Sequence, residues 1–201
     1  MGRVNVKDRA RSLTLNDMEL TAVWKAAEAG QGPFCALVLF LLLTGARRQE
    51  AVAMTWSEVD EAGNWLLPTP RNKAKFDLVR PLSKAAQATV AEQPHISDFI
   101  FTTGNRPLGG ISKHKAAFDA RCGVSDWCLH DLRRTARSLM SRAGVNADIA
   151  ERCLGHVIPG IRGTYDLYEY RDEKAHAFEA LAAQIERIVN PLPNVTAIRR
   201  G

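Results

Sequence analysis

The sequence predicts a mainly helical α+β domain that contains a small three-stranded antiparallel sheet. Several segments place apolar residues at helical spacing, and residues 34–43 form an almost uninterrupted apolar run. Between residues 55 and 82 the pattern changes to short apolar segments that turn-forming residues interrupt twice. The sequence contains no internal repeat or low-complexity tract. We therefore expect one domain at 13–190, after a basic arm or linker at 1–12 and before a tail at 191–201.

Composition excludes a membrane-spanning protein and leaves a nucleic-acid partner open. The 201 residues are 46% apolar and 24% charged, as in an ordinary soluble protein with a buried core. The run at 34–43 is too short to cross a bilayer. Lys and Arg number 27 against 22 Asp and Glu, which gives a net charge of +5 and a pI near 9.2. This excess permits binding to a polyanion but does not establish it.

The cysteines favour reduced thiols over disulfides or a zinc site. All four lie in apolar or helical segments, and no two have the C-x2-C spacing of zinc ligands. The first residues do not resemble a secretory leader. We therefore expect mostly buried thiols in a cytoplasmic protein. The four residues are Cys35, Cys122, Cys128 and Cys153.

Three helices are expected before the sheet, at about 14–30, 33–44 and 46–54. Thr14 can cap the first helix. Pro33 suits the first turn of the second helix, which is apolar on nearly every side and must therefore be surrounded by protein. The third helix begins with two adjacent arginines, which taken alone indicate only a solvated helix start.

The sheet is expected to lie between residues 55 and 82. Its turns are at 61–64 and 70–75, and Lys73 and Lys75 lie in the second turn. A lysine in such a turn usually serves only solubility. The three expected strands are Trp56–Val59, Asn64–Leu67 and Phe76–Leu82.

The second half of the chain is expected to be helical apart from a short extended segment at 96–101. Ser83 and Ser112 can cap the first two helices, and Gly144 separates the third from the fourth. The expected helices span 83–93, 112–121, 130–142, 146–153 and 171–189.

Residues 130–165 gather side chains suited to a phosphodiester. His130 and Arg133 are three residues apart and project from one face of a helix, whose first turn already favours an anion. An L-G-H segment ends at His156, and Tyr165 follows nine residues later. Each feature alone is weak, because a surface His beside an Arg and a half-buried Tyr are common. Their order, after G-A-R at 45–47 and a hairpin lysine, indicates one site.

With these motifs the chain closely resembles the catalytic domain of the tyrosine recombinases, the phage integrase family. The resemblance extends from about Leu13 to Val189 and implies that family's catalytic-core fold. It is carried by four segments, LLLTGARRQEAVAMTW, RNKAKFDLVRPLS, HDLRRTARSLM and LGHVIPGIRGTYD.

The resemblance implies a phosphate pocket and a tyrosine nucleophile. Glu50 matches a position that supports the first arginine of the pocket. The family implies no cofactor, and the sequence lacks the carboxylate cluster of a two-metal nuclease, so no metal is expected. The implied catalytic residues are Arg47, Lys73, His130, Arg133, His156 and the nucleophile Tyr165.

Three of these assignments have alternatives within the sequence. Arg48 is adjacent to Arg47, but the family's arginine directly follows the Gly-x pair, which selects Arg47. Lys75 competes with Lys73, which lies eight residues before the Pro of VRPLS. Tyr168 and Tyr170 follow Tyr165, whose distance from the L-G-H histidine matches the family.

The implied chemistry suits these side chains. Arg47 and Arg133 would clamp the non-bridging oxygens and stabilise the pentacoordinate transition state. His130 would accept the phenol proton or hydrogen-bond the phosphate, and Lys73 would protonate the departing 5′ oxygen. His156 would donate a hydrogen bond to the phosphate. The product is a 3′-phosphotyrosyl link that another 5′ hydroxyl can reverse without ATP.

The implied partner is double-stranded DNA. Ala175 to Ile188 form an apolar helix face, which either packs on its own domain or docks on a neighbouring protomer, as in a tetramer on DNA. Family members generally carry a DNA-gripping domain before the catalytic one, and at most twelve residues precede it here. We therefore expect an excised fragment that binds DNA weakly by itself.

Two other functions compete with a site-specific recombinase of a prophage or other mobile element. One is a DNA-binding regulatory module that keeps the fold without recombination, which would not need the complete residue set. The other is a type IB topoisomerase, which the compact L-G-H-to-Tyr segment disfavours. The DNA site, and the choice between integration, excision and dimer resolution, are not encoded in these motifs.

Overall fold

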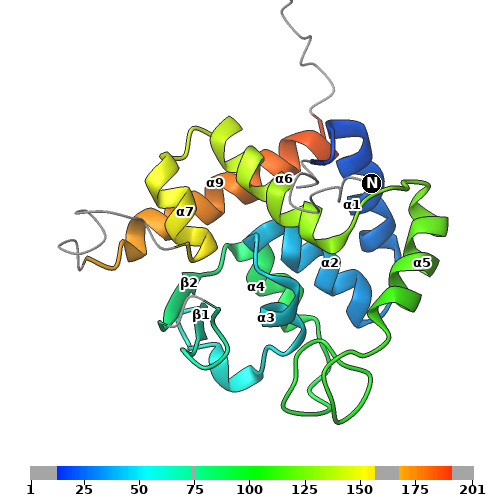
Figure 1. Cartoon of the computed structure of the whole chain (residues 1–201), viewed down its shortest axis with the longest axis horizontal. Coiled ribbons are helices and arrows are strands. Elements are labelled where there is room, and N and C mark those ends of the chain that lie inside the picture. Colours follow the sequence, from blue (N-terminus) through cyan, green and yellow to red (C-terminus); the bar gives the residue numbers. More distant parts are fainter. Residues whose placement is uncertain (1–12, 74–75, 157–167, 192–201) are drawn as a thin grey trace, which may run out of the picture.

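The computed structural model describes residues 13–73, 76–156 and 168–191 of the chain. Within these ranges the fold is mainly helical with one small antiparallel sheet, as the sequence predicts (Figure 1). The elements in chain order are α1 (Asp17–Ala29), α2 (Pro33–Thr44), α3 (Arg48–Val52), the 3-10 turn η2 (Trp56–Glu58), β1 (Asn64–Leu67), β2 (Leu78–Pro81), α4 (Lys84–Ala91), α5 (Ile111–Cys122), α6 (Leu129–Arg142), α7 (Ala147–Leu154) and α9 (Arg171–Val189).

Helix α2 lies at the centre of the fold. Pro33 occupies its first turn, and ten of its twelve residues are buried. It contacts α1, α4, α6 and α9, which surround it (Figure 1). A helix that is apolar all round gains from burial on every side, so this position follows directly from its composition. Gly45 ends α2 in the left-handed conformation, and its N–H donates to the Leu41 carbonyl.

Helix α9 packs on its own domain. It contacts α1, α6, α7 and β2, and Phe178, Leu181 and Ile185 are buried in these contacts. At its first turn the buried Lys174 donates from Nζ to the Val79 carbonyl of β2 at 2.8 Å. Burial lowers the pKa of Lys174. Of the two roles expected for the apolar face of this helix, packing within the domain is the one observed.

The sheet has two strands rather than three in the described part of the chain. β1 and β2 pair antiparallel, with Asn64 opposite Pro81 and Leu67 opposite Leu78. The predicted first strand, Trp56–Val59, is instead the 3-10 turn η2. Only single bridges flank this turn, Thr55 with Phe99 and Val59 with Trp65.

The reason for this difference is a set of contacts that hold Glu58 inward. The Glu58 carboxylate accepts from the indole Nε1 of Trp65 at 3.1 Å and pairs with Arg71. The Trp56 N–H donates to the Asp98 carbonyl, far along the chain. A helical turn brings Glu58 to these partners, and a continuous strand ladder does not form.

Two predicted helix starts were also wrong by a few residues. Asn16, not Thr14, caps α1 and forms a reciprocal capping box with Glu19. Gly110, not Ser112, precedes α5. The predicted cap Ser83 is confirmed, since its hydroxyl accepts from the Ala86 N–H.

The four cysteines are free thiols. Cys35 and Cys153 are buried as expected, and Cys122 is partly buried, but Cys128 is exposed at the start of α6. Burial raises the pKa of Cys153 to about 12. None of the helices in the described ranges has both the length and the apolar character needed to cross a bilayer.

Replacing Gly45 by Ala should destabilise the protein more than the same change at Gly144. Both glycines have positive φ, 58° and 79°, so each alanine incurs a strain of about 1–2 kcal/mol. An added Cβ at Gly45 would lie 2.6 Å from Leu154 Cδ2, whereas one at Gly144 has no neighbour within 4 Å. Urea unfolding should therefore show an additional loss of about 1–3 kcal/mol for Gly45→Ala. Equal losses would contradict the crowding at Gly45.

Candidate active site

The turn after α2 presents Arg47. Gly45 reverses the chain, and Arg47 then occupies the N-cap position of α3 in extended conformation. Its guanidinium donates to Glu50 Oε1 at 2.7 Å, and its backbone N–H donates to Glu50 Oε2 at 3.3 Å. Glu50 therefore fixes both the backbone and the side chain of Arg47, in agreement with the supporting role expected for it.

Glu50 is itself a buried carboxylate shared by two arginines. Only 3% of it is exposed, and Arg80, which is fully buried on β2, donates to its Oε2 at 2.8 Å. Burial alone would raise the pKa of Glu50. The charges and hydrogen bonds of Arg80 and Arg47 outweigh this and hold the pKa below its ordinary value.

Arg133 connects three elements beneath the turn. This α6 residue is only 4% exposed. Its guanidinium donates to the Gly45 carbonyl at 2.7 Å and to the Leu154 carbonyl, at the end of α7, at 2.9 Å. Burial, followed by the charge of Arg47, lowers the pKa of Arg133 to about 9. The side chain thus remains a cation at neutral pH.

His156 lies directly against Arg133. Its Nε2 is 2.7 Å from an Arg133 nitrogen, which can only donate, so Nε2 is the acceptor. The ring proton is therefore on Nδ1, which faces the Glu151 carboxylate. Glu151 also accepts from Arg137 Nε at 2.7 Å. In this state His156 Nε2 accepts from Arg133 and does not present the donor that the sequence predicts.

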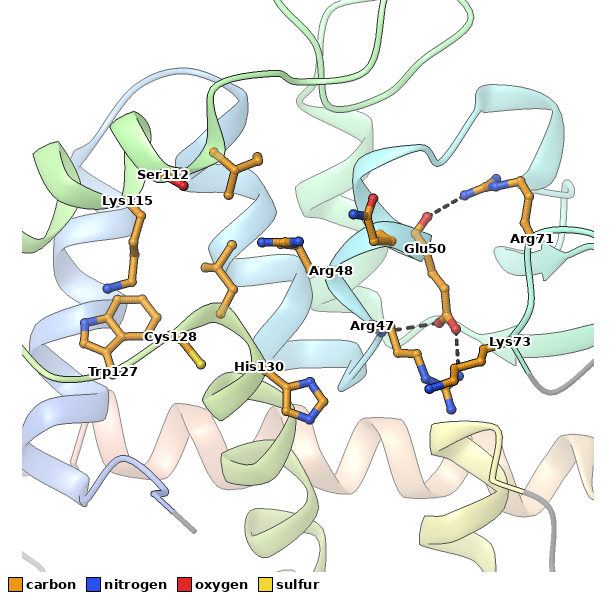
Figure 2. A pocket seen from close by; sticks show the side chains of 13 residues that line it. Arg47, Arg48, Glu50, Arg71, Lys73, Ser112, Lys115, Trp127, Cys128 and His130 are labelled. Carbon is orange, nitrogen blue, oxygen red and sulfur yellow. Dashed lines mark hydrogen bonds and ion pairs between the residues drawn. The ribbon is translucent and has the colours of Figure 1, made fainter. Parts of the chain in front are cut away.

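Arg47, Lys73 and His130 line one cavity of about 730 Å³. Figure 2 shows Lys73 beside Arg47, and His130 on α6 to the left of them. Lys73 is exposed, and the residues before it are anchored. Arg71 donates to the Glu50 carbonyl at 2.6 Å, and Asn72 donates to the Phe76 carbonyl at 2.7 Å.

His130 stands in the first turn of α6 with its ring at the cavity. Partial burial, followed by the positive charges of Arg134 and Arg133, lowers its pKa below 6.5. The ring is therefore mostly neutral at pH 7. Neither His130 nor Lys73 forms a hydrogen bond with another described residue, so both can meet a ligand.

The structure does not bring every candidate into this cavity. His156 lines a smaller neighbouring hollow of about 190 Å³ together with Tyr168. The Tyr170 ring centre is 4.1 Å from the Arg152 guanidinium, and neither Tyr168 nor Tyr170 lines the larger cavity. Tyr165 and Lys75 lie outside the described residues, so the choices that involve them stay predictions.

Arg80 is the site residue that the sequence reasoning missed. Besides Glu50, it donates to the Cys153 carbonyl at 3.3 Å and to the Leu154 carbonyl at 3.5 Å. Its guanidinium also lies 4.8 Å from the centre of the Trp65 ring. Arg80 thus shares one acceptor with Arg47 and another with Arg133. An arginine within the apolar stretch Leu78–Leu82 was the available signal.

The family follows from comparison with known sequences. The model of the phage integrase family matches residues 14–166, about three quarters of the chain. The chain belongs to the phage integrase family. This is the family that the sequence motifs indicate.

One curated relative of this phage integrase family domain is the prophage integrase IntZ of Escherichia coli (strain K12). The two are 29% identical over 187 residues, which cover 87% of this chain and 46% of the relative. The chain therefore spans about half the length of the curated relative it matches.

Solved structures of the family share the fold. The lambda integrase catalytic core superposes with a TM-score of 0.59 at 21% identity, covering 71% of this chain and 94% of that one. A lambda integrase tetramer bound to a Holliday junction superposes with a TM-score of 0.59 at 20% identity, covering 72% of this chain and 46% of that one. The XerH recombinase bound to its difH substrate superposes with a TM-score of 0.56 at 16% identity, covering 78% of this chain and 50% of that one. The family's catalytic-core fold, predicted from the sequence, is thereby confirmed.

Replacing Arg80 by Met should lower the free energy of unfolding at pH 7 by about 3–5 kcal/mol, because Glu50 stays buried with half of its compensation removed. Because the folded state lowers the pKa of Glu50, the ionised carboxylate stabilises the fold at pH values above its unfolded-state pKa near 4.5. This stabilisation is lost as pH falls through the folded-state pKa. In Arg80→Met the pKa of Glu50 should rise, so the difference in unfolding free energy from the wild type should shrink as pH falls and the carboxylate is protonated. Urea unfolding between pH 3 and 8 measures both effects.

The control is the double variant Arg80→Met/Glu50→Gln, compared with each single variant. Removal of both buried charges should cost less than the sum of the single changes. Strict additivity of the three unfolding free energies would show that Arg80 and Glu50 do not stabilise each other.

Proposed function

We propose that this domain cleaves and rejoins double-stranded DNA as a site-specific recombinase of a prophage or other mobile element. The observation that carries the proposal is the convergence of Arg47, Lys73 and His130 on one cavity, with Arg133 held beneath the same turn. Three elements far apart in the sequence contribute these residues. Two fixed guanidinium groups, an ammonium and a neutral imidazole are suited to phosphoryl transfer at a DNA backbone.

Tyr165 is the proposed nucleophile. Its phenol oxygen forms a bond to the scissile phosphorus, and the bond from phosphorus to the 5′ oxygen breaks. The phenol proton passes to His130, and Lys73 supplies a proton to the leaving 5′ oxygen. The products are a 3′-phosphotyrosyl link and a free 5′ hydroxyl. Attack by a second 5′ hydroxyl reverses these transfers, so the cycle needs no ATP.

Arg47 and Arg133 are proposed to hold the non-bridging oxygens. Both guanidinium groups are fixed by protein acceptors before any ligand arrives, which reduces the reorganisation needed in the transition state. His156 would donate from Nε2 to a phosphate oxygen once that oxygen has taken over the Arg133 nitrogen and Nε2 has gained a proton. Its Nδ1 contact with Glu151 would then orient the ring.

DNA and further copies of this chain are the proposed partners. Lambda integrase has been solved as a dimer on a core site and as a tetramer on a Holliday junction, and such an assembly is proposed here on DNA. Docking through the C-terminal helix would use the outer surface of α9, because its apolar face is covered within the domain. Such a substrate implies action in the cytoplasm.

A denaturation-resistant adduct with DNA tests the proposed chemistry. The chain is incubated with nicked duplexes that are randomised around the nick, so that the short 5′-hydroxyl product diffuses away. Covalent adducts are then recovered under denaturing conditions and sequenced. We expect adducts that share a sequence and that are absent with Tyr165→Phe.

Other outcomes of this experiment point to the competing assignments. Persistence of the adduct in Tyr165→Phe would assign the nucleophile to Tyr168 or Tyr170. Absence of any adduct, with DNA binding retained, would favour the regulatory module. Adducts without a shared sequence, together with relaxation of supercoiled plasmid, would favour a type IB topoisomerase.

In a plot of the rate of adduct formation against pH, the decline on the acid side (the acid limb) should lie below pH 6.5. His130 accepts a proton only when neutral, and its lowered pKa keeps it neutral down to a pH below its ordinary value of 6.5. The single-turnover rate should therefore fall as pH decreases through that lowered pKa. The same profile in His130→Gln should lose this limb and have a rate on the order of 10²-fold lower. A limb that survives in His130→Gln would assign the proton transfer elsewhere.

A further inference from the structure

The cavity that holds the proposed catalytic residues extends well beyond them. Its opposite end is lined by Arg48, Ser112, Lys115 and Trp127. Ser112 and Lys115 belong to α5, which contributes none of the proposed catalytic residues. Figure 2 shows Arg48 directed toward this α5 end, away from the Arg47 guanidinium beside Lys73. The two adjacent arginines therefore serve different ends of one cavity.

Arg48 differs from the other arginines that line the cavity, because it has no partner among the described residues. Arg47 is paired with Glu50, and Arg71 with Glu58. Lys115 lies 2.5 Å from an Asp119 oxygen and 3.7 Å from the centre of the Trp127 ring. Arg48 is exposed and forms no hydrogen bond or ion pair with any residue that the structure describes. An uncompensated cation in a concave surface attracts an anion.

Arg48 also lines a second hollow of about 580 Å³. That hollow lies over the start of α5 and includes Lys113 and Ser112. The described residues that line this hollow include no carboxylate. Those that line the catalytic cavity include one, the buried Glu50. Because Arg48 and Ser112 belong to both walls, the two hollows form one groove with a basic lining that runs from Arg47 past Arg48 to α5.

We propose that Arg48, supported by Lys113 and Lys115, forms a second phosphate subsite that binds a backbone phosphate neighbouring the one held by Arg47 and Arg133. This inference rests on the proposed function in that DNA supplies the phosphate. Successive phosphates follow each other closely along a strand, so a strand seated at Arg47 presents another one to the groove. The planar guanidinium of Arg48 suits a bidentate contact, and such contacts set the position of the duplex without reading its bases.

The test is a salt titration of DNA binding by fluorescence anisotropy, with a labelled duplex of arbitrary sequence and KCl from 50 to 200 mM. Loss of one phosphate contact in Arg48→Gln should reduce the slope of log affinity against log salt by about one and weaken binding on the order of fivefold at low salt. Arg48→Lys keeps the charge and should keep most of the slope. The matched control is Arg187→Gln, an exposed arginine at the end of α9 with the same charge change.

Equal slopes for Arg48→Gln and the wild type, or an equal reduction in Arg187→Gln, would overturn the subsite. Thermal unfolding of each variant checks for a loss of fold, which is not expected because Arg48 is exposed and forms no hydrogen bond or ion pair with a described residue. These binding measurements do not require cleavage, so they decide the subsite even when the covalent adduct fails to form.

The adduct experiment then places the subsite relative to the cleaved bond. A neutral methylphosphonate is introduced at each phosphate that flanks the scissile one in a recovered sequence. The wild type should bind less tightly when the methylphosphonate replaces one particular neighbouring phosphate. At that position the methylphosphonate should not weaken the binding of Arg48→Gln any further. Arg48→Gln should also raise the DNA concentration for half-maximal adduct formation. Additive losses at every flanking position would contradict a contact with a neighbouring phosphate.

Discussion

The buried Glu50 carboxylate is the interaction on which the candidate site depends. A carboxylate removed from water is costly unless charges and hydrogen bonds compensate it, and here Arg47 and Arg80 both do so. Arg47 approaches from the turn after α2, and Arg80 from β2, so one anion joins the helical part of the domain to the sheet. The same carboxylate therefore also holds Arg47 in place through its side chain and its backbone N–H.

A second junction completes the arrangement on the other side. The Leu154 carbonyl, at the end of α7, accepts from both Arg133 and Arg80, and the Gly45 carbonyl accepts from Arg133. Each acceptor is a backbone group at the end of a helix, where carbonyls lack helical partners and carry partial negative charge. The helix ends thus orient the arginines before any phosphate is bound.

The accumulation of cations has an electrostatic cost that suits an anionic ligand. Burial and the nearby charges of Arg47 and Arg80 lower the pKa of Arg133 to about 9. Partial burial and positive neighbours likewise lower the pKa of His130. An anion beside these groups would relieve this repulsion, so the arrangement favours an anionic ligand. The proposed groove past Arg48 extends the same preference along the DNA strand.

The sequence alone determined the helical elements, the central place of α2 and the order of the motif residues. These features are expressed locally, as apolar period, capping residues and spacing along the chain. It did not determine that residues 56–58 form a turn, because the partners of Glu58 and Trp56 lie at Trp65, Arg71 and Asp98. Nor did it show that Arg80 is buried against Glu50, or that His156 accepts from Arg133. Those outcomes depend on which distant groups meet in the folded chain and must satisfy one another's charge and hydrogen bonds, and only the tertiary structure decides that.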